Sequence, residues 1–164
     1  MGTTGSRFLV DLTAGRLAKW LRVLGHDTLF FRGPGEEALR QALQEGRVLL
    51  TRDRRLLSHP WALSARVRVL ALRSDGPWEQ VQQVVEEMGL TPTPSFSLCI
   101  RCNTTLRPVE KQAVRERVPP YVFQGQEEFR ECPKCGRLYW KGSHWRNMQA
   151  ELERLAGQGR TGVP

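Results

Sequence analysis

Short apolar runs alternate with segments of helical periodicity along the first half of the chain. Four apolar runs predict strands at 8–10, 28–31, 48–51 and 67–72. Their continuous apolar character indicates a sheet that is covered on both faces. Between them, apolar residues recur at helical spacing, as in Leu17, Trp20, Leu21 and Leu24 before Gly25. Further helices are predicted from Pro34 to Gly46 and from Pro77 to Gly89.

This order of elements predicts an α/β fold, a mostly parallel sheet with helices on both faces. The segment "TPTPS" at 91–95 has two prolines and indicates a linker. We therefore expect a first domain at 1–92 and a second at 96–156. The second domain should end in a helix over 142–156, and a disordered tail is expected at 157–164.

The second half contains the four cysteines of the chain. They form two C-x-x-C pairs, Cys99 with Cys102 and Cys132 with Cys135, separated by 29 residues. This spacing favours one tetrahedral metal site closed by four thiolates, which predicts structural zinc, with iron as the alternative. Five aromatic residues of this half either stack nucleic-acid bases or fill the small core: Tyr121, Phe129, Tyr139, Trp140 and Trp145.

Three aspartates follow predicted strands. Asp11 follows 8–10, Asp53 follows 48–51, and Asp75 lies just beyond 67–72. Sites in open parallel sheets form at the carboxyl ends of the strands, and clustered carboxylates there suit catalytic magnesium or manganese. Two such ions can hydrolyse a phosphodiester. The alternative is that these acids are turn residues, with Asp53 capping a helix that begins at Arg54.

The chain is basic, with 25 Lys and Arg against 17 Asp and Glu, a formal net charge of +8. This excess favours a polyanionic partner such as RNA, although a merely solvated surface is the alternative. Arg16, Lys19 and Arg22 recur every three residues and are expected to form a basic stripe that binds RNA. No apolar run approaches the roughly 20 residues that span a bilayer, so we expect no membrane partner and a cytoplasmic location.

Several segments together resemble the Mut-seven C-terminal RNase domain family: "FLVDLTAGRLAKWLRVLGHDT", "EGRVLLTRDRRLL", the two cysteine pairs and "CGRLYWKGSHW". The resemblance runs from about residue 7 to residue 150. It implies a PIN-like nuclease fold joined to a zinc ribbon, and a metal-dependent ribonuclease. It also implies that Asp11 and Asp53 are the matching carboxylates, that Arg52 of the "TRD" motif contacts phosphate, and that Asp27 is structural.

The sequence departs from the family pattern at Gly35, where related PIN-like proteins usually have an aspartate. Glu36 and Glu37 follow directly, and Glu36 is the preferred replacement, with Glu37 or neither as alternatives. The expected catalytic set is therefore Asp11, Asp53, Glu36 and Asp75. Besides the ribonuclease, two readings stay open: a non-catalytic RNA-binding module, and a protein-interaction adaptor that docks through the ribbon.

Overall fold

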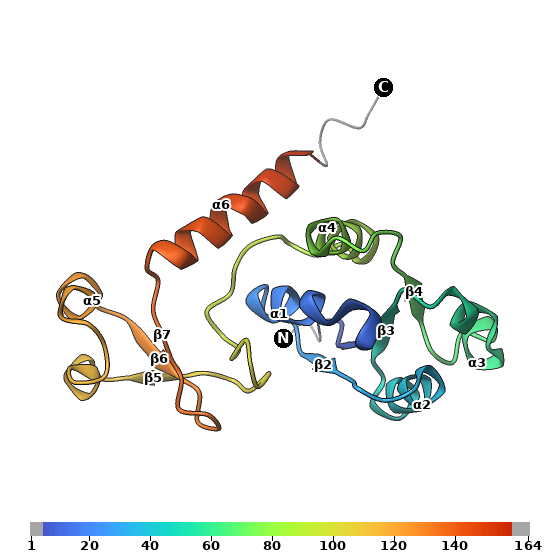
Figure 1. The fold of residues 1–164 in the computed structure, drawn as a ribbon, viewed down its shortest axis with the longest axis horizontal. Helices are drawn as coiled ribbons and strands as arrows, with labels where there is room; N and C mark the ends of the chain where they lie inside the picture. Colours follow the sequence, from blue (N-terminus) through green and yellow to red (C-terminus); the bar gives the residue numbers. More distant parts are fainter. Residues whose placement is uncertain (1–4, 159–164) are drawn as a thin grey trace. The chain divides into compact units, whose positions relative to one another are not determined.

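The computed structural model describes residues 5–158 and divides the chain into two compact units, Met1–Thr91 and Pro92–Pro164 (Figure 1). The first unit is an α/β fold with a four-stranded parallel sheet, and the second contains a small antiparallel sheet. The α/β class expected from the sequence is therefore confirmed. None of the helices described in residues 5–158 combines the length and the apolar character that crossing a membrane requires.

The first unit contains four parallel strands in the order β2-β1-β3-β4. The strands and helices of this unit are β1 (Phe8–Val10), η1 (Leu12–Ala14), α1 (Gly15–Val23), β2 (Thr28–Phe30), α2 (Gly35–Glu45), β3 (Val48–Thr51), η2 (Arg54–Ser58), α3 (Pro60–Leu63), β4 (Val69–Ala71) and α4 (Pro77–Met88). Helices α1 and α4 contact each other, whereas α2 contacts β1 and β3. Figure 1 shows α2 on the side of the sheet opposite to α1 and α4.

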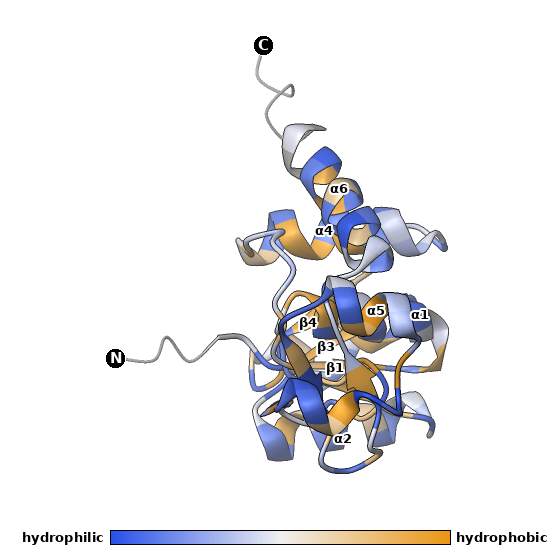
Figure 2. Ribbon diagram, turned by 90° about the vertical axis from the view of Figure 1, so that its left-hand side faces the viewer, coloured by the Kyte–Doolittle hydropathy of each residue, from blue (hydrophilic) through white to orange (hydrophobic). Residues whose placement is uncertain are grey.

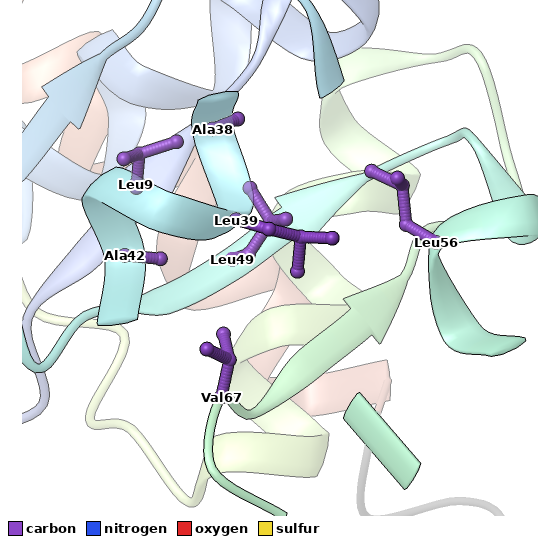
Figure 3. Close-up of a cluster of buried hydrophobic side chains, with 7 residues drawn as sticks. All are labelled: Leu9, Ala38, Leu39, Ala42, Leu49, Leu56 and Val67. Carbon is purple, nitrogen blue, oxygen red and sulfur yellow. The ribbon is translucent and has the colours of Figure 1, made fainter. Parts of the chain in front are cut away.

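The register of the strands explains how this sheet forms a core. Leu9 pairs with Leu29 and Leu49, and Leu49 pairs with Val69, so one residue from each strand lies in a single row. Because side chains on a strand alternate between faces, this row points to one side of the sheet. There it packs with the α2 residues Ala38, Leu39 and Ala42 and with Leu56 and Val67 (Figure 3).

The apolar character of the strands holds on both faces. Phe8 and Val10, the neighbours of Leu9 on β1, are buried completely, as are Leu49 and Leu50 on β3. Strands β1, β3 and β4, which are labelled in Figure 2, accordingly appear mainly in orange. Burial on both faces is what the continuous apolar runs predicted.

Two helices of the first unit, α2 and α4, end at a glycine. Gly46 after α2 and Gly89 after α4 both have φ +65°, the left-handed conformation in which a side chain is strained. Directly after Gly46, Arg47 is buried and donates to Asp27 Oδ1 at 2.8 Å and to the Phe8 carbonyl at 3.1 Å. Asp27 thus ties the start of the sheet together, the structural role that the family resemblance implied.

The second unit is a three-stranded antiparallel ribbon followed by a long helix. Its elements are β5 (Arg107–Val109), η3 (Lys111–Val114), α5 (Pro120–Gly125), β6 (Phe129–Glu131), β7 (Leu138–Tyr139) and α6 (Ser143–Gln158), with strand order β5-β6-β7. Val114, Val118, Val122 and Phe129 form its buried apolar cluster. The segment between the two cysteine pairs therefore supplies most of the apolar core of this unit.

The structure differs from the sequence-based expectation at several ends. Strand β4 is shorter than the expected 67–72, and the short helices η1, α3, η3 and α5 were not predicted. Helix η2 begins at Arg54, where the alternative interpretation of Asp53 as a helix cap placed it. Helix α6 extends to Gln158, so the first two residues of the expected tail at 157–164 are helical. Residues 159–164 of that tail lie outside the described residues.

Candidate functional site

Two groups of side chains are candidates for chemistry, one in each unit. The first lies at the carboxyl ends of β1 and β3, which are neighbours in the sheet. Val10 pairs with Leu50, so Asp11 and Thr51 follow at the same edge. We call Asp11, Thr13, Thr51 and Asp53 the carboxylate edge.

Asp11 is almost completely buried, at 4% exposure, and both of its carboxylate oxygens accept hydrogen bonds. The Thr13 amide and hydroxyl donate to Oδ1 at 2.9 and 2.5 Å, and the Thr51 hydroxyl donates to Oδ2 at 2.5 Å. Three donors of this kind offset the desolvation of a buried carboxylate. The Asp11 side chain is therefore held in one orientation.

The two threonine hydroxyls also accept hydrogen bonds from the segment that carries Asp53. The Arg52 amide donates to Thr13 Oγ1 at 2.8 Å, and the Asp53 amide donates to Thr51 Oγ1 at 3.0 Å. Each hydroxyl thus bridges Asp11 to the backbone after β3. This network fixes the loop of Asp53 relative to the Asp11 carboxylate.

The Asp53 side chain is engaged by its own neighbours. It is the N-cap of η2 and accepts from the Arg55 amide at 3.0 Å. The Arg55 guanidinium adds two bonds, from Nε to Oδ1 and from Nη2 to Oδ2, both 2.9 Å. The hydrogen bond from this guanidinium lowers the pKa of the Asp53 carboxyl below its usual value. The helix-cap reading of Asp53 is therefore confirmed, and the residue is 24% exposed at its side chain.

The other two expected acids do not join Asp11 and Asp53. Glu36 and Asp75 are exposed, on the first turn of α2 and in the loop before α4 respectively. Within residues 5–158, the metal-binding arrangement found with three or more ligand atoms within 4.8 Å of one another consists of cysteines, not carboxylates. Among the described residues, neither Asp75, expected at a strand end, nor Glu36, expected at the start of the second helix, therefore forms such a close group with Asp11 and Asp53.

Position 35, where related proteins have an aspartate, is closed by a neighbour. A Cβ atom on Gly35 would lie 3.2 Å from Leu56 Cδ1 and 3.3 Å from Cδ2. Leu56 is 7% exposed and belongs to the cluster packed between the sheet and α2. Position 35 therefore faces η2, the helix capped by Asp53, and Leu56 occupies the space next to it.

The basic residues of the expected RNA surface divide into two groups. Arg16 and Lys19 on α1 are exposed, and so is Arg52 beside Asp53. Arg22 is buried, at 8% exposure, and its Nε donates to the Thr28 carbonyl at 3.0 Å. The expected exposed stripe is therefore wrong for Arg22. Its side chain points inward, and this hydrogen bond links α1 to β2, the next strand in the chain.

The second candidate is the four-cysteine cluster of Cys99, Cys102, Cys132 and Cys135. Each residue offers a sulfur, and these atoms all lie within 4.8 Å of one another. Cys99 Sγ and Cys135 Sγ are 3.8 Å apart. Four sulfurs at about 2.3 Å from a tetrahedral zinc are about 3.8 Å from one another, so the donor type and the spacing both fit this metal.

Backbone amides and a tyrosine contact the sulfurs of this cluster. The Cys102 amide donates to Cys99 Sγ at 3.4 Å, and the Cys135 amide donates to Cys132 Sγ at 3.5 Å. The pKa of the Cys99 thiol is lowered to about 7, because hydrogen bonds, first that of the Tyr139 hydroxyl, outweigh the effect of burial. Burial and the neighbouring Cys135 thiol raise the pKa of Cys102 to about 12.

The sequence left two roles open for the aromatic residues of the second unit: stacking on nucleic-acid bases, or filling the small core. Phe129 is buried in the apolar cluster, and Trp140 packs against that cluster. Tyr139 packs against Cys99 and Cys132. Tyr121 is 75% exposed on α5. Most of these rings therefore fill the ribbon core, and Tyr121 remains accessible to a partner.

Comparison with models of known protein families identifies the family of this chain. The Mut7-C RNAse domain model matches residues 6–152, which includes both the carboxylate edge and the four-cysteine cluster. The chain belongs to the Mut7-C RNAse domain family. The resemblance inferred from the sequence is thereby confirmed. No curated protein and no solved structure gives a significant match.

Membership of the Mut7-C RNAse domain family implies a nuclease-type function and makes RNA the expected substrate. The carboxylate edge has the oxygen donors that magnesium and manganese prefer. It supplies two carboxylates, those of Asp11 and Asp53, and two threonine hydroxyls. The donor chemistry thus fits a divalent ion, provided that the Arg55 guanidinium yields its place at Asp53.

Reasoning from the sequence missed three partners in this Mut7-C domain: Thr13, Thr51 and Arg55. The two threonines had a visible signal, since "DLT" at 11–13 and "TRD" at 51–53 each place a threonine two residues from an aspartate. Each hydroxyl donates to Asp11 and accepts from a backbone amide after β3, that of Arg52 for Thr13 and that of Asp53 for Thr51. Arg55 had no such signal, because Arg52 and Arg54 lie even closer to Asp53 in the chain.

Proposed function

We propose that this protein is a divalent-metal-dependent ribonuclease that hydrolyses RNA phosphodiester bonds at the carboxylate edge. The observation that carries the proposal is the hydrogen-bonded unit that joins Asp11 to the Asp53 loop through Thr13 and Thr51. It occurs at the carboxyl edge of a parallel sheet, where sites of such folds form, in a chain matched by an RNase family model.

Asp11 and Asp53 would hold the divalent ion. A bound ion would supply activation of water and stabilisation of the leaving oxygen. Thr13 and Thr51 orient the Asp11 carboxylate, because their hydroxyls donate to its two oxygens. A group oriented in advance loses less freedom when the reaction occurs.

Exposed basic residues next to the edge would bind the RNA backbone. Arg52 lies between Thr51 and Asp53 in the chain, and Arg16 and Lys19 lie on α1, which begins four residues after Asp11. Guanidinium groups suit phosphate because they offer paired donors in a plane. The proposed RNA-binding surface thus keeps Arg16 and Lys19 of the expected stripe, adds Arg52, and leaves out the buried Arg22.

In the second unit, we propose that the four-cysteine cluster binds one structural zinc ion. Four thiolate ligands leave no open position for substrate, so this metal would stabilise the ribbon and not take part in cleavage. Within the described residues, the buried clusters of the ribbon are small, one of four residues and one of three that includes Cys99 and Cys132. A metal that links Cys99 and Cys102 to Cys132 and Cys135 would hold its two ends together.

A second function, a non-catalytic RNA-binding module, is favoured by two observations. Arg55 engages both oxygens of Asp53, and no third carboxylate joins Asp11 and Asp53 within the described residues. Such a module would keep the basic surface and lack cleavage. Salt-dependent RNA binding would distinguish either RNA function from a protein-interaction adaptor.

The deciding experiment measures RNA cleavage with manganese for wild type, Asp53→Asn and Glu86→Gln. Glu86 is an exposed acid on α4, so its substitution controls for the loss of one negative charge. We expect Asp53→Asn to lose cleavage and Glu86→Gln to retain it. If wild type binds RNA but never cleaves it, the non-catalytic module is the better description. Equal cleavage by all three proteins would place the active site elsewhere.

A further inference from the structure

One contact at the four-cysteine cluster comes from outside the two cysteine turns. The Tyr139 hydroxyl on β7 lies 3.1 Å from Cys99 Sγ. The same oxygen accepts a hydrogen bond from the Ile100 amide at 3.2 Å. Tyr139 therefore connects the third strand of the ribbon to the first cysteine turn, 40 residues earlier in the chain.

The chemistry of the two groups fixes the direction of this hydrogen bond when a metal is bound. A cysteine coordinates zinc as a thiolate, which has no proton to donate. The phenol has one proton, and its oxygen already accepts from the Ile100 amide. The hydroxyl must then donate to sulfur, so the contact becomes O–H···S⁻.

A donor at this place has an electrostatic effect on the site. Zinc with four thiolates has two excess negative charges, and Cys99 is completely buried. The amides of Cys102 and Cys135 reduce this charge from within their own turns. The tyrosine adds a donor that the C-x-x-C spacing alone does not provide. Donors that contact metal ligands orient them and tune how firmly they hold the metal.

We propose that Tyr139 is a positioning residue of the metal site, whose hydroxyl donates to the Cys99 thiolate and slows the loss of the bound metal. This inference rests on the proposed metal binding by the four cysteines. A purely structural role is the competing explanation, because the Tyr139 ring packs against Cys99, Leu106 and Cys132. The two roles separate at the hydroxyl, since phenylalanine keeps the ring and removes only the donor.

The chain offers a matched control. It contains two tyrosines, and the second, Tyr121, is 75% exposed on α5, where no hydrogen bond to a cysteine is found among the described residues. Tyr139→Phe and Tyr121→Phe therefore remove the same group from two environments. Both variants are made in the full chain, and both are compared with wild type after loading with zinc or cobalt.

Two readouts are measured: the rate at which a chelator removes zinc, and the sulfur-to-cobalt charge-transfer band of the cobalt form. We expect Tyr139→Phe to lose zinc faster by roughly 10- to 100-fold, the factor by which removing a group that supports a ligand typically weakens metal affinity. We also expect its charge-transfer band to move to lower energy, because a thiolate without the O–H donor holds its electrons less tightly. Tyr121→Phe should match wild type in both measurements.

Three results would overturn the inference. Wild-type behaviour of Tyr139→Phe in both measurements would show that the hydroxyl does not act on the metal. Faster zinc loss without a band shift would show that only packing had loosened. Failure of Tyr139→Phe to bind metal would show a structural requirement for the hydroxyl and not a tuning role. If wild type itself bound neither metal, the proposed zinc site would fail as well, which distinguishes the two proposals.

Discussion

The four-cysteine cluster and the carboxylate edge use their potential ligands in opposite ways. In the cluster, four sulfurs converge within 4.8 Å, and the groups that contact them are donors that suit a thiolate bound to metal. At the edge, the carboxylates already have protein partners, Thr13 and Thr51 for Asp11 and Arg55 for Asp53. The cluster is thus arranged as a metal site would be, whereas the divalent ion of the proposed ribonuclease would have to displace Arg55 from Asp53.

This difference follows from how each group is assembled. A C-x-x-C turn brings two sulfurs together through local backbone geometry, and only the meeting of two turns depends on the fold. The carboxylates come from separate strands, and each has several hydrogen-bonding neighbours that compete for its oxygens. Short sequence spacing therefore predicts the first kind of site much better than the second.

The largest expected effect is the loss of the cluster. Cys132→Ser combined with Cys135→Ser should abolish zinc binding and unfold the ribbon, because structural zinc contributes about 10–16 kcal/mol in small domains. Elemental analysis should fall from about one zinc per chain to none, and circular dichroism should show lost structure. Lys134→Ser, an exposed change in the same turn, is the control. Full zinc content in the double variant would contradict the assignment.

The next effect tests how firmly the edge is built. Asp11→Asn should lower the free energy of unfolding by about 1–3 kcal/mol, because an amide in place of Oδ2 leaves the Thr51 hydroxyl proton without its acceptor. Urea unfolding measures this change. Asp53→Asn should cost less, since Asp53 is more exposed than Asp11 and its guanidinium partner lies at the surface. If both variants lost the same free energy of unfolding, the hydrogen bonds of Asp11 would contribute no more to stability than those of Asp53.

A smaller effect concerns the RNA surface next to the edge. Arg16→Gln combined with Lys19→Gln should flatten the slope of log affinity against log salt by about 1.4, two contacts at about 0.7 each for single-stranded RNA. Binding titrations at several salt concentrations measure the slope. The exposed pair should account for the whole contribution of α1, because Arg22 is buried. An unchanged slope would show that this helix face is only solvated.

The smallest expected effect tests whether Arg55 competes with a metal ion for Asp53, which is the feature that distinguishes the carboxylate edge from the four-cysteine cluster. Arg55→Gln removes the partner of Asp53 and should raise manganese affinity roughly two- to fivefold, as expected for an exposed ion pair. Paramagnetic resonance of free manganese measures the affinity. Weaker binding in this variant would mean that Arg55 supports the ion and does not compete with it.

The same variant has a predicted pH dependence. In wild type the pKa of Asp53 is lowered, chiefly by the hydrogen bond from Arg55. The stability from this pair is therefore present above the ordinary aspartate pKa and is lost as the pH falls through the lowered value. Arg55→Gln should move the pKa of Asp53 upward, which carbon NMR of the carboxyl group can follow. A pKa that stayed unchanged would assign the lowering to the η2 cap alone.

The sequence predicted the parallel sheet, its three main helices and the cysteine cluster, because each depends on local periodicity or spacing. It predicted Asp11 and Asp53 at strand ends for the same reason, whereas the pairing of β1 with β3 is known only from the strand order of the structure. It could not predict that Arg22 turns inward to the Thr28 carbonyl, since a three-residue recurrence does not say which side of a helix is covered. Nor could it choose between Arg52, Arg54 and Arg55 as the partner of Asp53, which depends on side-chain conformation.

The close approach of Gly35 and Leu56 couples these two positions. A Cβ atom at position 35 would lie 3.2 Å from Leu56 Cδ1, so Gly35→Asp requires this core side chain to give way by a few tenths of an ångström. A smaller residue at position 56 would remove that contact, at a cost in packing of its own. We therefore expect the two substitutions to be epistatic: the stability of the double variant should differ from the sum of the two single effects.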